Sequence, residues 1–395
     1  MRGHTLLLAV VLAYLPTTVA TAAGSSHLKE LHVAPAPCQA PCIGYTTSNE
    51  LQNDWTFAAS PSRLTSNNLY PTLESDLVLA PLDKLQVLGD FIFEPVKDAT
   101  PGHDHAFNDL GAFVDQLFLQ AQTHGLNLQA GKIHPAFGRA WDVTPGLHST
   151  DIPGEYELEE RIGTGAAYGF KSFGLETLVQ ASAFTVDRTV LSESAFTNRH
   201  RTHLSDGGAG NTSGVSSLAI QLDGCLGAPA IDCYGDGDFG YELGARYQQA
   251  GRGGAGDELG LVASANKSIG FEEKTVRLLA EAAWFRNFEG ARDDALFLTA
   301  SAELEIEPLS YSLAYTRQQN LPSGGSDQLL EVAAAYDLGE AMSFVGEEWS
   351  IAFGYSIRRD QGEDTHVLAV LLTVDFGGSL PLSAASRQHA SLPRP

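Results

Sequence analysis

The stretch LFLTASAELEI (296–306) decides the fold class, because its side chains alternate strictly in character. One face carries only leucine, alanine and isoleucine, at positions 296, 298, 300, 302, 304 and 306. The other face carries Phe297, Thr299, Ser301, Glu303 and Glu305. A period of two sends alternate side chains to opposite faces of a β-strand. The stretch therefore predicts a strand with one apolar and one mainly polar face.

Segments 276–285, 309–318 and 349–358 repeat this alternation. Two architectures alternate in this way, an outer-membrane β-barrel and a soluble β-sandwich. Three features favour the barrel. The segments are about ten residues long, as a membrane requires. Their polar faces are rich in small residues, as suits a wet lumen. Tight turns alternate with long loops at 95–109, 136–160 and 187–213.

From this strand pattern we predict an all-β fold: a transmembrane antiparallel up-and-down β-barrel of about 16 strands over residues 51–376. The first candidate strand is weak because it is short and Pro61 follows it. One strand alternates badly, since Asp115 shares a face with Phe113, Leu117 and Leu119; a bulge or a misplaced boundary would explain this. The sixteen candidates lie at 51–59, 70–80, 84–94, 110–122, 126–135, 161–170, 173–186, 214–223, 239–249, 257–266, 273–286, 294–306, 309–319, 328–337, 349–359 and 365–376.

The N-terminus predicts export. Arg2 precedes an apolar run at 6–15, which is too short to span a membrane as a helix, and a small-residue cleavage site ends at Ala22. A short buried hydrophobic element is the alternative. We expect a signal peptide at 1–22, a periplasmic lead-in at 23–50 and a C-terminal tail at 377–395. The predicted location is the bacterial outer membrane.

Charge and cysteine content narrow the class further. The formal net charge of −24 disfavours binding to nucleic acid phosphates. The four cysteines form two local pairs, Cys38 with Cys42 and Cys225 with Cys233. In an exported protein such pairs predict disulfides; a zinc site formed by all four is the alternative.

The strand pattern also predicts which charged side chains face the lumen. Carboxylates outnumber bases there about three to one, which favours the passage of cations; the alternative is that they only solvate the inner wall. The principal lumen-facing residues are Glu242, Arg246, Arg277, Glu281, Glu303, Glu305, Glu331 and Arg358. Further candidates are Glu74, Asp76, Asp90, Glu94, Glu176, Asp337, Asp375 and Lys84.

One long loop, between the fifth and sixth candidate strands, has its own apolar anchors, including Phe137, Trp141 and Tyr156. Such a loop can fold into the lumen and narrow it, or it can pack on the outer rim. If it folds inward, it places opposite charges at a pore constriction: Arg139, Asp142, Asp151, Glu155, Glu157 and Arg161.

The block AGKIHPAFGRAWD, followed by PGLHSTDIPGEYELEERIGTGAAYGF, resembles a family of porins from Gram-negative bacteria. The segments FEPVKD, SAFTNRHRT and DGGAGNTSG are similar too, and together the match spans most of 70–376. The resemblance implies an outer-membrane β-barrel and a channel, but it does not identify a solute. One departure is that Phe376 is internal, whereas such barrels usually end on a C-terminal aromatic residue.

The sequence holds no GxSxG, Walker or HExxH motif, and we predict neither an enzyme nor a cofactor or metal site. The function expected is passive diffusion of small hydrophilic solutes, with a cation preference. The alternative is a non-conducting structural or adhesive barrel with binding loops. Expected partners are outer-membrane lipid, lipopolysaccharide, the barrel-assembly machinery, small solutes or ions and a homotrimer.

Overall fold

A computed structural model describes residues 40–321, 324–339, 348–360 and 362–382. Sixteen long strands form one closed antiparallel sheet, because β1 pairs with both β2 and β18. The predicted all-β transmembrane barrel of 16 strands is confirmed. The strands are β1 (Cys42–Ser60), β2 (Ser66–Leu82), β3 (Leu85–Pro95), β5 (Leu110–Thr123), β6 (Leu126–Ile133), β7 (Arg161–Ser172), β8 (Leu175–Val186), β10 (Ser217–Leu226), β11 (Phe239–Gln248), β12 (Glu258–Phe271), β13 (Lys274–Arg286), β14 (Asp294–Ile306), β15 (Leu309–Leu321), β16 (Ser326–Asp337), β17 (Glu348–Asp360) and β18 (Glu363–Pro381).

Shorter elements lie in the connections. Two-residue strands pair with the sheet near its long-loop end, and the described helices are single turns. Among the described residues, no helix is long and apolar enough to cross a membrane. These elements are β4 (His105–Ala106), β9 (Ala195–Phe196), α1 (Ala140–Val143), α2 (Asp151–Gly154), α3 (Cys233–Asp236), η1 (Ser62–Leu64), η2 (Val190–Ser192), η3 (Leu204–Asp206), η4 (Ala230–Asp232) and η5 (Phe288–Gly290).

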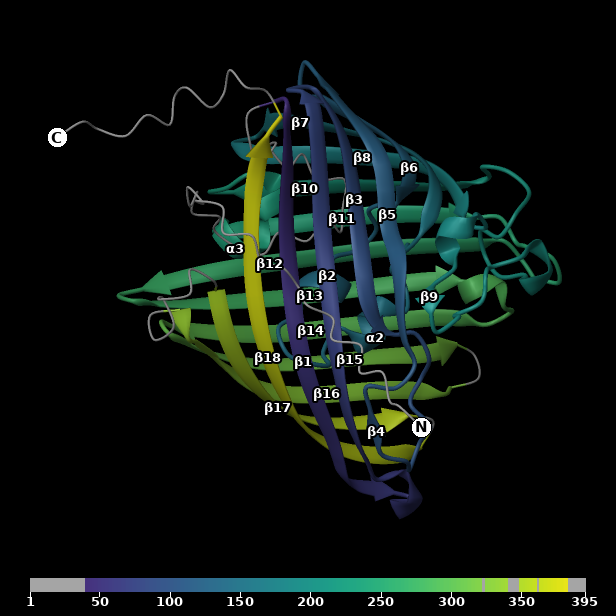
Figure 1. The fold of residues 1–395 in the computed structure, drawn as a ribbon, viewed down its shortest axis with the longest axis vertical. Helices are drawn as coiled ribbons and strands as arrows, with labels where there is room; N and C mark the ends of the chain where they lie inside the picture. Colours follow the sequence, from purple (N-terminus) through teal and green to yellow (C-terminus); the bar gives the residue numbers. More distant parts are fainter. Residues whose placement is uncertain (1–39, 322–323, 340–347, 361, 383–395) are drawn as a thin grey trace, which may run out of the picture.

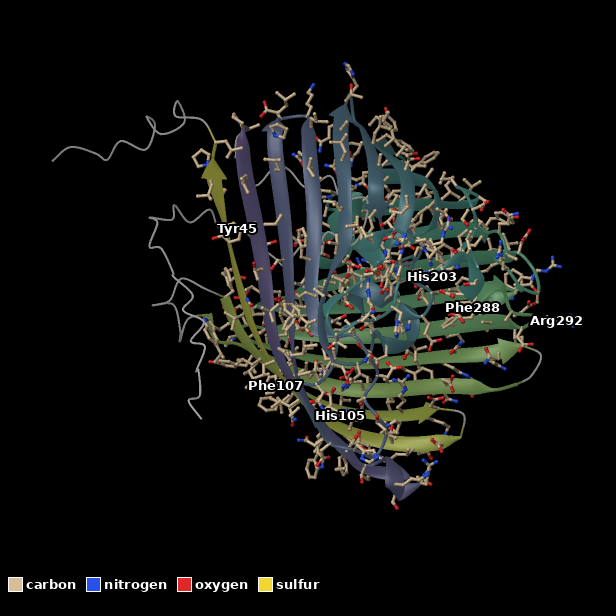
Figure 2. The ribbon with its side chains drawn as sticks, turned by 45° about the vertical axis from the view of Figure 1, so that its right-hand side comes forward. Tyr45, His105, Phe107, His203, Phe288 and Arg292 are labelled. Atoms are coloured by element: carbon tan, nitrogen blue, oxygen red, sulfur yellow. A yellow bond between two sulfur atoms is a disulfide. The ribbon has the colours of Figure 1, made fainter. Side chains whose placement is uncertain are left out.

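The strands tilt strongly around the barrel. In Figure 1 the front strands β1, β2, β3 and β18 run nearly vertically, whereas β12 to β16 at the back run nearly horizontally. Figure 2 places His203, Phe288 and Arg292 toward the long-loop end, and Tyr45 toward the opposite end of β1. Strand tilt of this kind is what closure of a sheet into a barrel requires.

The two faces of the sheet differ as a membrane barrel requires. Large apolar side chains are exposed on the outer face, for example Trp55 at 52%, Leu243 at 51% and Phe353 at 53%. Polar side chains such as Gln120 and Glu242 are fully buried on the inner face. A soluble protein rarely exposes an apolar surface of this extent. The arrangement therefore fits lipid outside and a polar interior.

Two predicted boundaries are wrong at the ends of the barrel. Strand β1 begins at Cys42, not at 51, and β18 continues to Pro381, not to 376. The extensions pair with each other, with Cys42 opposite Pro381 and Ser48 opposite Asp375. Residues 42–50 are too polar to show a strand by themselves, and they also pair with β2, with Cys42 opposite Ala80 and Glu50 opposite Thr72. The predicted signal peptide, most of the lead-in and tail residues 383–395 lie outside the described residues.

A β-bulge explains the irregular alternation around Asp115. Asp90 of β3 pairs with Gln116, but the next residue, Phe91, pairs with Val114, so Asp115 is the extra residue. An extra residue shifts the inward-facing set by one position. Asp115 therefore lies inside while Leu119 is 46% exposed outside.

The predicted asymmetry of the turns is confirmed. Two-residue turns join β2 to β3, β5 to β6, β7 to β8, β12 to β13 and β14 to β15. The long connections at 96–109, 134–160 and 187–216 lie at the other end. The connection between β10 and β11, on the short-turn side, is longer than these turns, since it spans 227–238 and contains η4 and α3.

Candidate functional site

The long connection at 134–160, here called the inward loop, packs against the inner wall of the barrel. Lys132 to Trp141 are ten consecutive buried residues. Aromatic and aliphatic side chains of the loop form one core with inward-facing residues of β8 to β16. The cluster contains Phe137, Trp141, Ile152, Tyr156, Leu158, Phe184, Ala219, Val262, Ala283, Phe285, Phe288, Ala295, Phe297 and Leu329. The apolar anchors that the sequence singled out thus hold the loop inside, and α2 appears behind the front strands in Figure 1.

Arg139 is the main ionic anchor of the inward loop. Its Nε donates to Glu242 of β11 at 2.6 Å, and its Nη2 donates to Asp223 of β10 at 2.7 Å. Its Nη1 lies 3.4 Å from Oδ1 of Asn266 on β12. The side chains of Arg139, Asp223 and Glu242 are at most 10% exposed. One guanidinium therefore pairs with two carboxylates at a buried contact between loop and wall.

Glu281 of β13 receives the backbone of the same turn. Its carboxylate accepts from the N–H groups of Arg139 at 2.9 Å and Ala140 at 3.2 Å. The Tyr156 hydroxyl also donates to Glu281. Burial raises the pKa of Tyr156, and the charge of Glu281 adds to the shift, so the phenol stays protonated and remains a donor. Glu281 thus ties both arms of the loop to one strand.

Arg246 of β11 supports the second arm of the loop. Its Nη1 donates to the carbonyl of Tyr156, and its Nε donates to Glu258 at 2.8 Å. The guanidinium lies over the rings of Phe137 and Phe285, at 4.8 and 4.5 Å from their centroids. A cation that lies on two aromatic faces and bonds to a carboxylate is held in one orientation. Arg246 therefore supports the inward loop with a side chain that is held in one orientation.

His148 fastens the middle of the loop to three strands. Its Nε2 lies 3.2 Å from Oδ1 of Asp54 on β1, and its Nδ1 lies 3.7 Å from Oε1 of Glu331 on β16. Glu331 also accepts from the backbone N–H groups of Leu147 and His148, each at 2.9 Å. Burial alone would lower the pKa of His148, but hydrogen bonds to Asp54 and Glu331 outweigh burial and raise it to about 10. The imidazole is therefore charged at neutral pH, between two carboxylates. Its Nδ1 also lies 3.5 Å from the Ser356 hydroxyl on β17.

Two acids of the loop are less enclosed. Asp151 pairs with Arg358 of β17 at 3.1 Å, and its side chain is 37% exposed. Glu155 is exposed as well. Partial burial raises the pKa of Glu155 to about 7, and the charge of Asp327 adds to this shift while Arg358 opposes it. These two carboxylates are the members of the predicted constriction set that reach solvent most clearly.

The root of the loop holds the remaining predicted residues. His134 lies 3.3 Å from Asp115 and 3.5 Å from Glu157. Asp142 lies half-buried in α1. Arg161 begins β7, where Arg246 and Glu159 are among its electrostatic neighbours. The structure therefore places the six predicted constriction residues along or beside one loop, where Arg139, Asp151 and Glu157 have the side-chain partners described above.

The predicted lumen-facing residues divide into two groups. Five of them contact the inward loop, as described: Glu242, Arg246, Glu281, Glu331 and Arg358. The other three form a separate cluster, in which Arg277 pairs with Glu303 at 3.4 Å and with Glu305 at 2.7 Å. Lys84, by contrast, lies in the exposed turn between β2 and β3.

The connection between β10 and β11 carries the predicted Cys225–Cys233 disulfide, which is confirmed. Both cysteines are buried with Ala167, Leu178, Ala228 and Ala230. The Asn266 side chain donates to the Cys233 carbonyl at 3.1 Å, and Asn266 also contacts Arg139. The disulfide turn and the inward loop therefore meet at one asparagine. Cys38 lies outside the described residues, so its pairing with Cys42 stays a prediction.

Several residues at the site were missed from the sequence. Asp223 stands at the very end of the predicted strand 214–223, and nothing in the local sequence singles out His148. Lys132 is fully buried and pairs with Glu160 at 3.3 Å and Asp187 at 3.2 Å. A lysine on the inward face next to an acidic segment was the only signal that could have found this cluster.

The fold has known counterparts. The sequence matches no protein-family model and no curated protein sequence. The chain resembles the outer membrane channel DcaP of Acinetobacter baumannii, with a TM-score of 0.50, 11% identity, and coverage of 85% of this chain and 96% of that one. It also resembles the low-pH structure of OprB of Pseudomonas putida, with a TM-score of 0.50, 8% identity, and coverage of 85% and 93%. At such identities the likeness shows the fold, which is that of a transmembrane β-barrel.

Proposed function

We propose that this protein is an outer-membrane channel of the porin type through which small hydrophilic solutes diffuse passively. The observation that carries the proposal is the combination of a closed barrel, an apolar outer face and an inward loop held by charged side chains. A loop that only covered the rim would not need Arg139 inside the barrel. The channel fold of DcaP supports the same function.

The path of the solute follows from where the loop is anchored. The buried aromatic core and the Arg139 contacts fill the interior along β8 to β14. The inner wall of β18, β1 and β2 lies across the barrel from this packed side (Figure 1). We therefore propose that the open path runs along that wall, past Asp151 and Glu155 of the loop. Arg139 acts as an anchor of the constriction, not as its lining.

The charge of the interior supports a cation preference. Arg139 alone faces Asp223, Glu242 and Glu281, so even the anchored side keeps an excess of carboxylates. The wall along the proposed path carries further acids at Glu74 and Asp76 on β2. Acidic pore walls attract cations and repel anions.

Recording from the refolded protein in a planar lipid bilayer tests the proposal. We expect stepwise, ohmic conductance and a reversal potential of the sign for cations in a salt gradient. Heat-unfolded protein at the same concentration is the matched control. Anion selectivity would contradict the assignment of the acidic path while leaving the channel intact.

A structural or adhesive barrel is the second candidate, because the loop and the disulfide turn fill much of one side of the interior. In that case the barrel would shift on a heat-modifiability gel but would give no conductance. The proposed partners, which are membrane lipid, lipopolysaccharide, the assembly machinery and a homotrimer, apply to both candidates.

A further inference from the structure

Three carboxylates converge on the inner wall at β2 and β3. In the β2–β3 ladder Asp76 lies directly opposite Asp90, and Glu74 lies two residues further along β2 on the same face. One oxygen atom from each side chain lies within 4.8 Å of the other two. Like charges directly opposite each other destabilise a sheet. The cluster therefore requires a positive charge or a bound proton to be stable.

Asp90 is the member of the cluster that shows the need for such a charge most directly. Its side chain is 1% exposed, and neither carboxylate oxygen has a hydrogen-bond partner among the described residues. Asp76 differs, because its Oδ2 accepts from the Thr46 hydroxyl at 3.0 Å. A buried carboxylate without a donor costs several kcal/mol. At least one carboxylate oxygen of Asp90 therefore faces the cluster.

A shared proton is the competing explanation. Asp115 lies close enough to Asp90 for a carboxyl–carboxyl hydrogen bond, which needs one of the two groups to be protonated. Asp115, however, already has a basic partner in His134, at 3.3 Å. A cation bound by Asp90 and its β2 neighbours would stabilise the cluster without a proton.

We propose that Glu74, Asp76 and Asp90 bind a hard divalent cation, with Ca²⁺ preferred. Carboxylate oxygens without nitrogen or sulfur ligands suit Ca²⁺ and Mg²⁺. Two oxygens that share a Ca²⁺ at 2.3–2.6 Å lie at most about 5 Å apart, which the observed spacing satisfies. The shorter bonds of Mg²⁺ limit this distance to about 4.2 Å. Waters complete the coordination. The site does not depend on conductance, although an ion there would reduce the negative charge of the proposed path.

Calorimetric titration of the refolded full-length protein tests the site. The protein is stripped with a chelator, freed of lipopolysaccharide, and titrated at neutral pH with Ca²⁺ and separately with Mg²⁺. We expect one saturable Ca²⁺ site per chain, weakened at least about tenfold in Asp90→Asn. Glu303→Gln is the matched control, since it removes one inner-wall carboxylate on β14, away from the cluster. The affinity of the Glu303→Gln variant for Ca²⁺ should equal that of the unsubstituted protein.

Two kinds of result would overturn the proposal, one from titration and one from infrared spectroscopy. One is the absence of saturable binding by the unsubstituted protein, or equal affinity in Asp90→Asn. The other is an infrared carboxylic-acid band that persists in saturating Ca²⁺ and disappears in Asp90→Asn, because it would show that a proton occupies the cluster. Heat-modifiable mobility confirms that each variant folds. If Asp90→Asn does not assemble, Glu74→Gln is titrated in its place with the same two criteria.

Discussion

The Nε atom of Arg139 lies 2.6 Å from Oε2 of Glu242, and these two residues are 103 positions apart in the sequence. The pair joins the inward loop to β11, and the Glu242 side chain is fully buried. Asp223 completes the contact from the neighbouring strand β10 at 2.7 Å. The loop is thus fixed to the wall by buried charge, and loss of this charge should release it.

Arg139→Ala is predicted to loosen the inward loop without preventing barrel formation. The substitution leaves Asp223 and Glu242 buried without their cation, which costs about 3–5 kcal/mol. We expect a lower free energy of unfolding in urea, measured in lipid vesicles, and a larger and noisier single-channel conductance. Arg359→Ala is the control, because its pair with Asp364 is exposed to solvent and should contribute little to stability. Equal stability of the two variants would show that the loop is held by its apolar core alone.

Much of this fold could be predicted because strand alternation is a local property. All sixteen strands were found from period-two patterns such as 296–306. The ends of β1 and β18 could not be found, since residues 42–50 show no clear alternation and are stabilised by pairing with both β2 and β18. The side of the sheet on which Asp115 lies also could not be predicted without the pairing register between β3 and β5. A β-bulge shifts the inward and outward alternation of side chains, and the amino-acid composition does not reveal it.

Tyr156→Phe is predicted to weaken the attachment of the inward loop to the barrel wall less than Arg139→Ala does. The hydroxyl donates to Glu281, and removal of one partner of a buried charged hydrogen bond costs about 1.5–3 kcal/mol. The ring remains, so the packing against Phe285 and Phe297 is kept. We expect the loss to appear in the unfolding free energy, with little change in conductance. A loss as large as that of Arg139→Ala would mean that Glu281 depends on this hydroxyl more than on its two backbone donors.

Cation preference is predicted to rise with pH through Glu155. Burial raises the pKa of Glu155 to about 7, so its carboxyl gains a negative charge between about pH 6 and about pH 8. Reversal potentials in a salt gradient should shift toward cation selectivity over this range. The pKa of Glu155 in the folded protein lies above its ordinary value of 4.5, so the protonated carboxyl stabilises the folded state. This contribution is fully present below pH 4.5 and is lost as the pH rises through about 7.

Glu155→Gln is the matched variant for the pH experiment, because it keeps the size of the side chain and removes the titration. Its selectivity should be flat across the same range. If Glu155→Gln retains the full pH dependence, another group titrates near pH 7 and Glu155 does not line the path.

The site was less predictable than the fold because its contacts link residues far apart in sequence. The six loop residues were found as charged positions, yet their partners were not assigned. Arg139 appeared to line a pore because nothing local shows that Asp223 and Glu242 enclose it. His148 was not selected at all, since its acidic partners lie on β1 and β16. Such contacts form only when the barrel closes, and a short stretch of sequence does not show which distant strands then meet.

The disulfide between Cys225 and Cys233 is predicted to stabilise the inward loop at a distance. The bond closes a short loop with a separation of 8 residues, so its loss should cost about 2 kcal/mol. The effect should reach the inward loop through Asn266, which donates to the Cys233 carbonyl and contacts Arg139. A double-mutant cycle with Cys225→Ala/Cys233→Ala and Arg139→Ala measures this coupling. We expect unfolding free energies that differ from additivity by about 0.5 kcal/mol or more. Strict additivity would show that the short-turn end of the barrel and the loop unfold independently, and that Asn266 only fills the space between them.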